Sequence, residues 1–139
     1  MIIKFIVIKT MFNKRKKFLK KEIERTNKLI FELPIKYDIV IEGKKMIREG
    51  IRIDYDKTKE IADGANTRLK IEQSSRNPNQ ALIEQMGKLA VDREADMKKM
   101  EEQMKALDQE VIEAENTKNS KVEAARSYIM IVEKMIKNG

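Results

Sequence analysis

The sequence predicts a mainly α-helical protein whose long helices form a coiled coil or a helical hairpin. Charged residues make up 38% of the chain and aromatic residues only 5%, and there are two Pro and no Trp. This balance is typical of long helices and coiled coils, and not of sandwiches or barrels. Apolar residues still make up 41% of the 139 residues, which argues against a disordered chain.

Residues 1–34 are expected to be a basic N-terminal segment with a short helix. They hold ten Lys or Arg and three acids, so they carry the whole net charge of +7. Five positions follow a 4-3-4-3 spacing that places them on one helical face: Leu19, Ile23, Thr26, Ile30 and Leu33. We expect Pro34 to end this helix, because Pro clashes with the preceding turn.

Residues 35–76 form the middle segment, most of which is expected to be helical. Apolar and small residues keep to one stripe: Ile47, Ile51, Tyr55, Thr58, Ala62, Ala65 and Leu69. Residues 2–8 and 35–41 are both β-branched and alike, so a small β element built from these two runs is the alternative. Residues 74–80 are expected to be a loop, with Asn77 as the N-cap of the next helix and Pro78 at its first position.

Residues 77–139 are expected to form one long heptad helix. Its seam has sixteen positions, and the three polar ones are Arg93, Lys118 and Lys121. The apolar pattern lapses at 116–120, where the helix either continues or breaks, and we favour the continuous helix. A seam this long is too one-sided to stay exposed on a lone helix, so we expect it to bind a second copy or a partner helix. The candidate interface residues are the thirteen apolar ones: Ile83, Met86, Ala90, Met97, Met100, Met104, Leu107, Val111, Ala114, Ala125, Tyr128, Val132 and Met135.

The basic run KRKKFLKK at 14–21 holds six bases and no acid. It can be a solvated arm, or it can contact the phosphates of nucleic acid and release counterions. Docking on an anionic membrane beside apolar residues is the third interpretation and the least favoured of the three. No base-reading motif accompanies the run, so nucleic-acid binding would be tolerant of sequence. The candidate binding residues are Lys14, Arg15, Lys16, Lys17, Phe18, Lys20, Lys21 and Arg25.

Several chemistries are absent from the sequence. There is no Cys and no His, which excludes thiolate catalysis, zinc–thiolate sites and every triad that uses His. No glycine-rich phosphate loop occurs, and the Asp and Glu residues alternate with Lys and Arg as on a solvated helix face. We therefore expect no enzyme activity, no cofactor and no metal. The apolar run at 5–8 is too short for a membrane span, so a soluble, cytoplasmic protein is expected.

Residues 46–107 resemble the central helical hairpin of phage small terminase subunits, over less than half of the chain. The resemblance rests on Ile47-Arg48-Glu49-Gly50, Ile61-Ala62, a Ser-x-x-x-Pro turn at Ser74 and Pro78, and a helix from Ala81 to Leu107. It implies an oligomeric, non-enzymatic DNA-recognition subunit that works beside a motor ATPase in the host cytoplasm or virion. The chain departs from that family in its hydrophobic N-terminus and in its seam after Leu107. No binding residue is carried over.

The leading prediction is a non-catalytic, oligomerising coiled-coil protein that acts as a structural or assembly component. The alternative is a sequence-tolerant DNA- or RNA-binding accessory protein that uses the basic segment. A small-terminase-like subunit and a recombination mediator that binds single strands would both fit this alternative.

Overall fold

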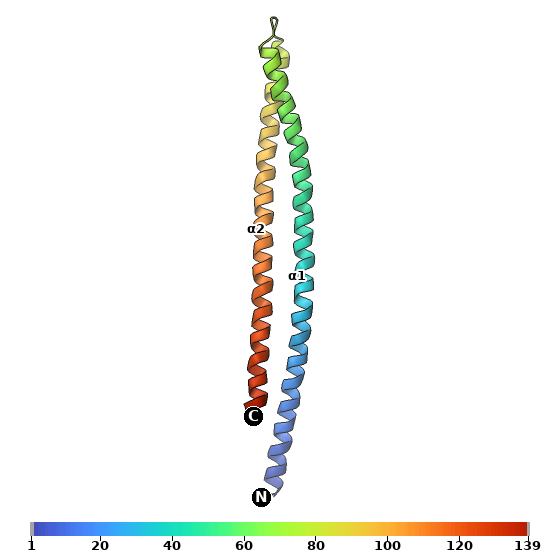
Figure 1. The fold of residues 1–139 in the computed structure, drawn as a ribbon, viewed down its shortest axis with the longest axis vertical. Coiled ribbons are helices and arrows are strands. Elements are labelled where there is room, and N and C mark those ends of the chain that lie inside the picture. Colours follow the sequence, from blue (N-terminus) through green and yellow to red (C-terminus); the bar gives the residue numbers. More distant parts are fainter. Residues whose placement is uncertain (1, 139) are drawn as a thin grey trace. The chain divides into compact units, whose positions relative to one another are not determined.

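The structure is a computed structural model that describes residues 2–138, with only the backbone described for Phe5. Two helices, α1 (Ile2–Gln73) and α2 (Gln80–Asn138), are joined by a short loop and pack against each other as a helical hairpin (Figure 1). This confirms the predicted fold class. Residues 2–8 and 35–41 both lie inside α1, so the β element considered for them does not form. Each β-branched residue lowers helix stability slightly, and this small cost is outweighed because the surrounding helix is long and continuous.

The loop between the helices differs from the prediction in its capping residue. Asn79 is the N-cap, because its Oδ1 accepts a hydrogen bond from the backbone N–H of Leu82 at 3.2 Å. The backbone N–H of Asn79 itself donates to Oε1 of Glu72 at 2.8 Å, which ties the loop back to the end of α1. Asn77, the expected cap, and Pro78 therefore lie in the loop before α2 begins at Gln80.

The chain divides into two compact units, residues 42–112 and residues 1–41 with 113–139. We call them the loop unit and the terminal unit. Each unit contains one stretch of α1 and one stretch of α2. Because α1 runs through residue 34, the expected N-terminal and middle segments share one helix.

The loop unit is held together by small buried residues and by polar contacts between the helices. Ala62, Ala65 and Ala90 are at most 4% exposed. Four side-chain pairs join α1 to α2 in this unit: Lys44–Glu110 at 2.9 Å, Arg48–Asp108 at 2.7 Å, Tyr55–Glu101 at 2.9 Å and Asn66–Glu94 at 3.4 Å.

The terminal unit buries larger side chains. Leu19 and Ile41 of α1 and Val132 of α2 are its buried apolar residues, and Val132 is only 2% exposed. Buried Thr26 is satisfied locally, because its hydroxyl donates to the carbonyl of Glu22 at 2.7 Å. Across the helices, Lys118 pairs with Asp38 at 2.9 Å, and the Lys121 ammonium lies 5.4 Å from the centre of the Tyr37 ring.

Pro34 does not end a helix, contrary to the prediction, but lies inside α1. Its missing N–H removes one backbone hydrogen bond, and the helix continues because packing on both sides of Pro34 stabilises it. Beside Pro34 the terminal unit has a groove of about 400 Å³. The groove is lined from α2 by Lys118, Asn119, Val122, Glu123 and Arg126.

Helix α2 continues without a break through 116–120, as favoured, but the face that it turns to α1 changes there. The inward positions Ala114, Lys118 and Val122 are separated by two successive steps of four. Helix α1 shows the same double step at Leu33, Tyr37 and Ile41. Two steps of four in a heptad pattern form a stutter, which locally unwinds a coiled coil. Both helices of the terminal unit therefore carry a stutter.

The stutter shifts the inward face of α2 away from three of the predicted seam positions. After Lys118 the residues that face α1 are Val122, Ala125, Ile129, Val132 and Ile136. Lys121, Tyr128 and Met135, which the unbroken heptad assigned to the seam, lie at the exposed edge of the helix contact instead, where Lys121 and Tyr128 still reach Tyr37 and Glu22 of α1. An all-apolar 3-4 pattern from Val122 to Ile136 was present in the sequence, and it was the signal for this change.

Candidate functional site

The basic run 14–21 lies on α1 in the terminal unit. All of its residues are exposed except Leu19, which packs towards α2. Because the run is helical, its side chains point in several directions. Lys14, Lys17 and Lys21, at spacings of three and four, share the side that faces away from α2.

The bases of this run differ from Arg25 in their pairing. Among the ion pairs of the described residues, none involves Lys14, Arg15, Lys16, Lys17, Lys20 or Lys21, and we call these six residues the basic surface. Arg25, in contrast, donates to Oε2 of Glu22 at 2.8 Å, and the same oxygen accepts from the hydroxyl of Tyr128 at 3.1 Å. The structure therefore brings together six of the seven predicted bases as unpaired charges. Phe18, also predicted, is exposed beside them.

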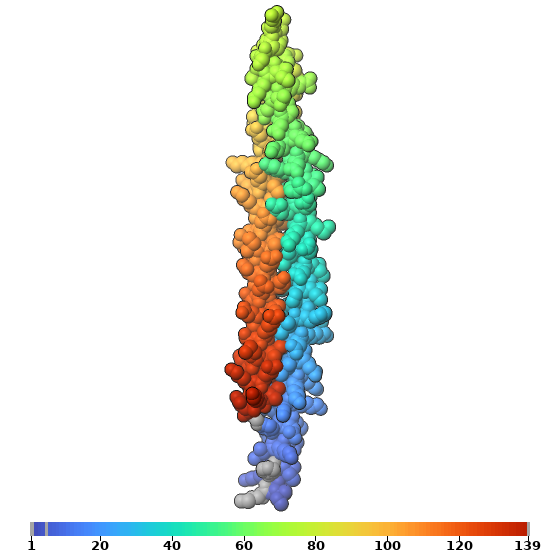
Figure 2. Space-filling view, viewed as in Figure 1, coloured from blue at the N-terminus to red at the C-terminus, as the bar shows by residue number. Residues whose placement is uncertain are grey.

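The residues just before the basic surface are a feature that the sequence interpretation missed. They continue α1 past the end of α2 within the terminal unit (Figures 1 and 2). We call the exposed apolar residues of this stretch the apolar overhang: Ile2, Ile3, Ile6, Val7, Ile8 and Met11. Ile3 is 79% exposed and Met11 is 66% exposed. The sequence signal was visible, but a short strand paired with residues 35–41 was the alternative considered for it.

Most of the predicted interface residues of α2 face α1 of the same chain. In the loop unit these are the half-buried or buried residues Ile83, Met86, Ala90, Met97, Met100, Met104, Leu107 and Val111. In the terminal unit they are Ala114, Ala125 and Val132, whereas Tyr128 and Met135 are exposed. The seam of α2 is therefore at least partly covered by α1 of the same chain.

Helix α1 carries large apolar residues on the side that faces away from α2. In the terminal unit these are Phe31, Ile35 and Ile39, and in the loop unit they are Met46 and Ile53. We call the three residues of the terminal unit the outward stripe. Phe31 is 71% exposed and Ile39 is 69% exposed. The spacings of four and seven set all five residues opposite the inward residues Leu33, Tyr37, Arg48, Ile51 and Tyr55.

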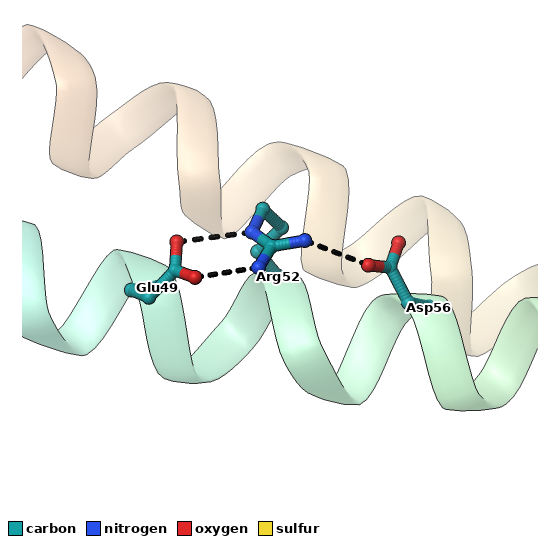
Figure 3. A network of polar contacts seen from close by, with 3 residues as sticks. All are labelled: Glu49, Arg52 and Asp56. Atoms are coloured by element: carbon teal, nitrogen blue, oxygen red, sulfur yellow. Dashed lines mark hydrogen bonds and ion pairs between the residues drawn. The ribbon is translucent and has the colours of Figure 1, made fainter.

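Several acidic residues are engaged in ordinary surface pairs. On α1, Arg52 donates to Oε2 of Glu49 at 2.9 Å and to Oδ2 of Asp56 at 2.8 Å (Figure 3). The hydrogen bond from Arg52 lowers the pKa of Glu49 below its ordinary value. No group of acids in the described part of the chain is arranged to hold a metal ion.

A groove of about 230 Å³ in the loop unit is not a convincing ligand site. It is lined by both helices, and its charged residues pair with neighbouring side chains. Lys44 pairs with Glu110, Arg48 with Asp108, and Lys45 with Glu42. Each charge that could hold a polar ligand therefore already has a partner from the chain itself.

Comparison with known proteins identifies no relative, since no family model, no curated protein and no solved structure matches this chain. Within residues 2–138, neither helix has a stretch that is both apolar enough and long enough to cross a membrane. Two exposed surfaces of the terminal unit remain as candidate sites: the basic surface with its apolar overhang, and the outward stripe.

Proposed function

We propose that this chain is a non-catalytic helical hairpin that self-associates and acts as a structural or assembly component. The observation that carries the proposal is the outward stripe of α1. A helix with apolar residues on two opposite faces can bury only one of them in a two-helix hairpin. Burial of the second face by further helices supplies the driving force for association.

The charges beside the outward stripe favour a second copy as the occupant. Along the terminal unit, Lys28, Glu32 and Lys36 alternate in sign next to the apolar residues, and Lys28 and Glu32 pair with each other on the exposed surface at 3.8 Å. Two copies can therefore place opposite charges against each other, as the flanking positions of coiled coils do. This surface differs from the predicted one, since the seam of α2 is already covered by α1.

Two features of the sequence support a non-catalytic role. The absence of His and Cys removes the commonest general base and the commonest strong nucleophile. The resemblance to small terminase subunits, which are oligomeric and non-enzymatic, points in the same direction.

Sedimentation velocity at micromolar concentrations tests the proposal. We expect the wild type to form a concentration-dependent oligomer. Phe31→Glu with Ile39→Glu should shift it to monomer with unchanged circular dichroism, because both side chains are exposed and their loss costs the fold little.

Asn13→Glu with Asn27→Glu is the matched control. It adds the same two charges at exposed positions of α1 in the same unit but removes no apolar side chain. This control should keep the wild-type mass. A strictly monomeric wild type, or an oligomer indifferent to the Phe31 and Ile39 changes, would contradict the proposal.

A further inference from the structure

The apolar overhang and the basic surface lie next to each other on one helix. Ile3, Val7, Met11 and Phe18 are all at least half exposed and fall within one side of α1 at spacings of four, four and seven. The basic surface begins at Lys14, three residues after Met11. This stretch of α1 is therefore an exposed apolar segment that is followed by a cluster of positively charged residues.

The charge of this stretch is of one sign only. Residues 2–21 contain eight Lys or Arg and no acid. Apart from the six residues of the basic surface, these are Lys4 and Lys9, and neither takes part in an ion pair among the described residues. A partner that covers the overhang must therefore tolerate or neutralise eight positive charges.

A second copy of the chain does not meet this requirement. Two overhangs that pack on each other would bring sixteen positive charges together with no acid to offset them, which opposes association. The outward stripe, with charges of both signs beside it, does not have this difficulty.

A nucleic acid meets the charge requirement but not the apolar one. Bases stack on aromatic side chains, and the described exposed aromatic residues here are Phe12 and Phe18. The overhang is otherwise aliphatic, and a phosphate backbone offers aliphatic side chains nothing to bind. A bilayer with anionic lipids meets both requirements, because acyl chains take up the aliphatic groups while headgroup phosphates attract the lysines.

We propose that residues 2–21 of α1 dock on the surface of an anionic lipid bilayer. The apolar overhang and Phe18 enter the boundary between headgroups and acyl chains, and the basic surface lies at headgroup level. The long lysine stems let their ammonium groups reach the phosphates while the helix lies among apolar atoms. This inference is independent of the proposed self-association, which uses the outward stripe.

Vesicle binding tests the inference directly. The full chain is mixed with phosphatidylcholine vesicles with or without phosphatidylserine, and bound protein is measured by co-flotation. The chain has no Trp, so Phe18→Trp provides a single tryptophan that can be excited selectively over the three Tyr, and its emission should shift to the blue on insertion and be quenched by lipids brominated near the headgroup. We expect binding only to the vesicles that contain phosphatidylserine, and the bound fraction should fall steeply as the salt concentration is raised.

Two pairs of substitutions separate insertion from simple charge attraction. Val7→Ser with Met11→Ser leaves the net charge unchanged and should weaken vesicle binding about tenfold or more. The control, Met130→Ser with Ile131→Ser, removes exposed apolar side chains from α2 of the same unit and should bind vesicles like the wild type. Circular dichroism should confirm that both variants stay helical.

Other outcomes would overturn the inference. If the Val7 and Met11 changes leave vesicle binding intact, the chain binds by charge attraction alone and its apolar residues do not enter the bilayer. Stronger binding to an oligothymidylate than to the anionic vesicles would identify the basic surface as a nucleic-acid site. A failure of self-association is recognised separately, because sedimentation of the Val7 and Met11 variant reports on the outward stripe alone.

Discussion

Tyr55 and Tyr128 each connect the two helices through a hydroxyl that donates to a carboxylate. In the loop unit the acceptor of Tyr55 is Glu101, and in the terminal unit the acceptor of Tyr128 is Glu22. Each of these hydrogen bonds raises the pKa of its tyrosine above the ordinary value, because the phenolate would lose the bond and face a negative charge. The folded state therefore holds these protons more tightly than the unfolded chain.

The raised pKa of Tyr55 predicts a pH effect of definite sign. A raised pKa in the folded state gives a stabilisation that is fully present below the ordinary pKa of 10.0 and is lost as the pH rises through the folded value. Glu101→Gln should therefore lower the pKa of Tyr55 towards its ordinary value. The measurement is the ultraviolet titration of tyrosinate in a chain with Tyr37→Phe and Tyr128→Phe, so that Tyr55 alone absorbs.

The same titration of a Glu102→Gln variant is the control for Tyr55. Glu102 is the exposed neighbour of Glu101 but does not bond to Tyr55. Its removal changes the net charge equally, so the pKa of Tyr55 should fall clearly less than with Glu101→Gln. Equal shifts in the two variants would mean that general charge, and not the hydrogen bond, sets this pKa.

At the scale of the element, the main feature is a helix that continues through a proline. Pro34 lacks the N–H that would bond to the carbonyl of Ile30, yet α1 extends on both sides of it. Leu33 and Tyr37, the inward residues around it, are half-buried. Packing therefore outweighs local preference at this position.

Replacement of Pro34 by Ala should stabilise the chain. It restores one backbone hydrogen bond and removes a helix penalty of about 3 kcal/mol, less about 1 kcal/mol for the freer unfolded chain, so we expect a net gain of about 2 kcal/mol. Thermal and urea denaturation followed by circular dichroism measure the change. Glu24→Ala, at an exposed position of α1 in the same unit and outside the outward stripe, is the control and should change the free energy of unfolding by less than about 0.5 kcal/mol.

The elements show where sequence reasoning succeeded and where it failed. Heptad spacing is a local property, so it located the inward residues of α2 from Ile83 to Ala114 correctly. The continuation through Pro34 and the stutter after Ala114 depend on what the partner helix presents, and the spacing within one helix does not contain that information. The apolar overhang was missed for a related reason, since β-branched runs favour strands until their actual neighbours are known.

At the scale of the whole molecule, the longest apolar seam of the chain, on α2, packs against α1 of the same chain. The seam that suggested a second chain is covered by α1 in both units, and the exposed apolar residues are concentrated on α1 instead. Of the large apolar residues that are exposed in the described part of the chain, eighteen lie on α1 and six on α2. The proposed self-association and membrane-docking surfaces both lie on α1 for this reason.

This arrangement predicts the effect of charges placed in the seam. Met100→Lys with Leu107→Lys should reduce the helicity of the isolated chain and lower its free energy of unfolding by about 2 kcal/mol or more, because both side chains are half-buried against α1. Val91→Lys with Ile112→Lys adds the same charge at exposed positions of the same helix and unit, and should leave helicity unchanged. Circular dichroism at low concentration distinguishes the two. Equal loss in both variants would mean that charge, and not burial, is responsible.

The packing of one face of α2 against α1 also restricts where residues can be inserted into or deleted from the chain. One inserted residue in α2 after Val122 would turn every later side chain by about 100° and carry Val132 from the buried face to the outside. An insertion of seven or of eleven residues returns the helix to almost the same face. Related chains are therefore expected to differ in α2 by whole repeats, with single-residue gaps confined to the loop at 74–79.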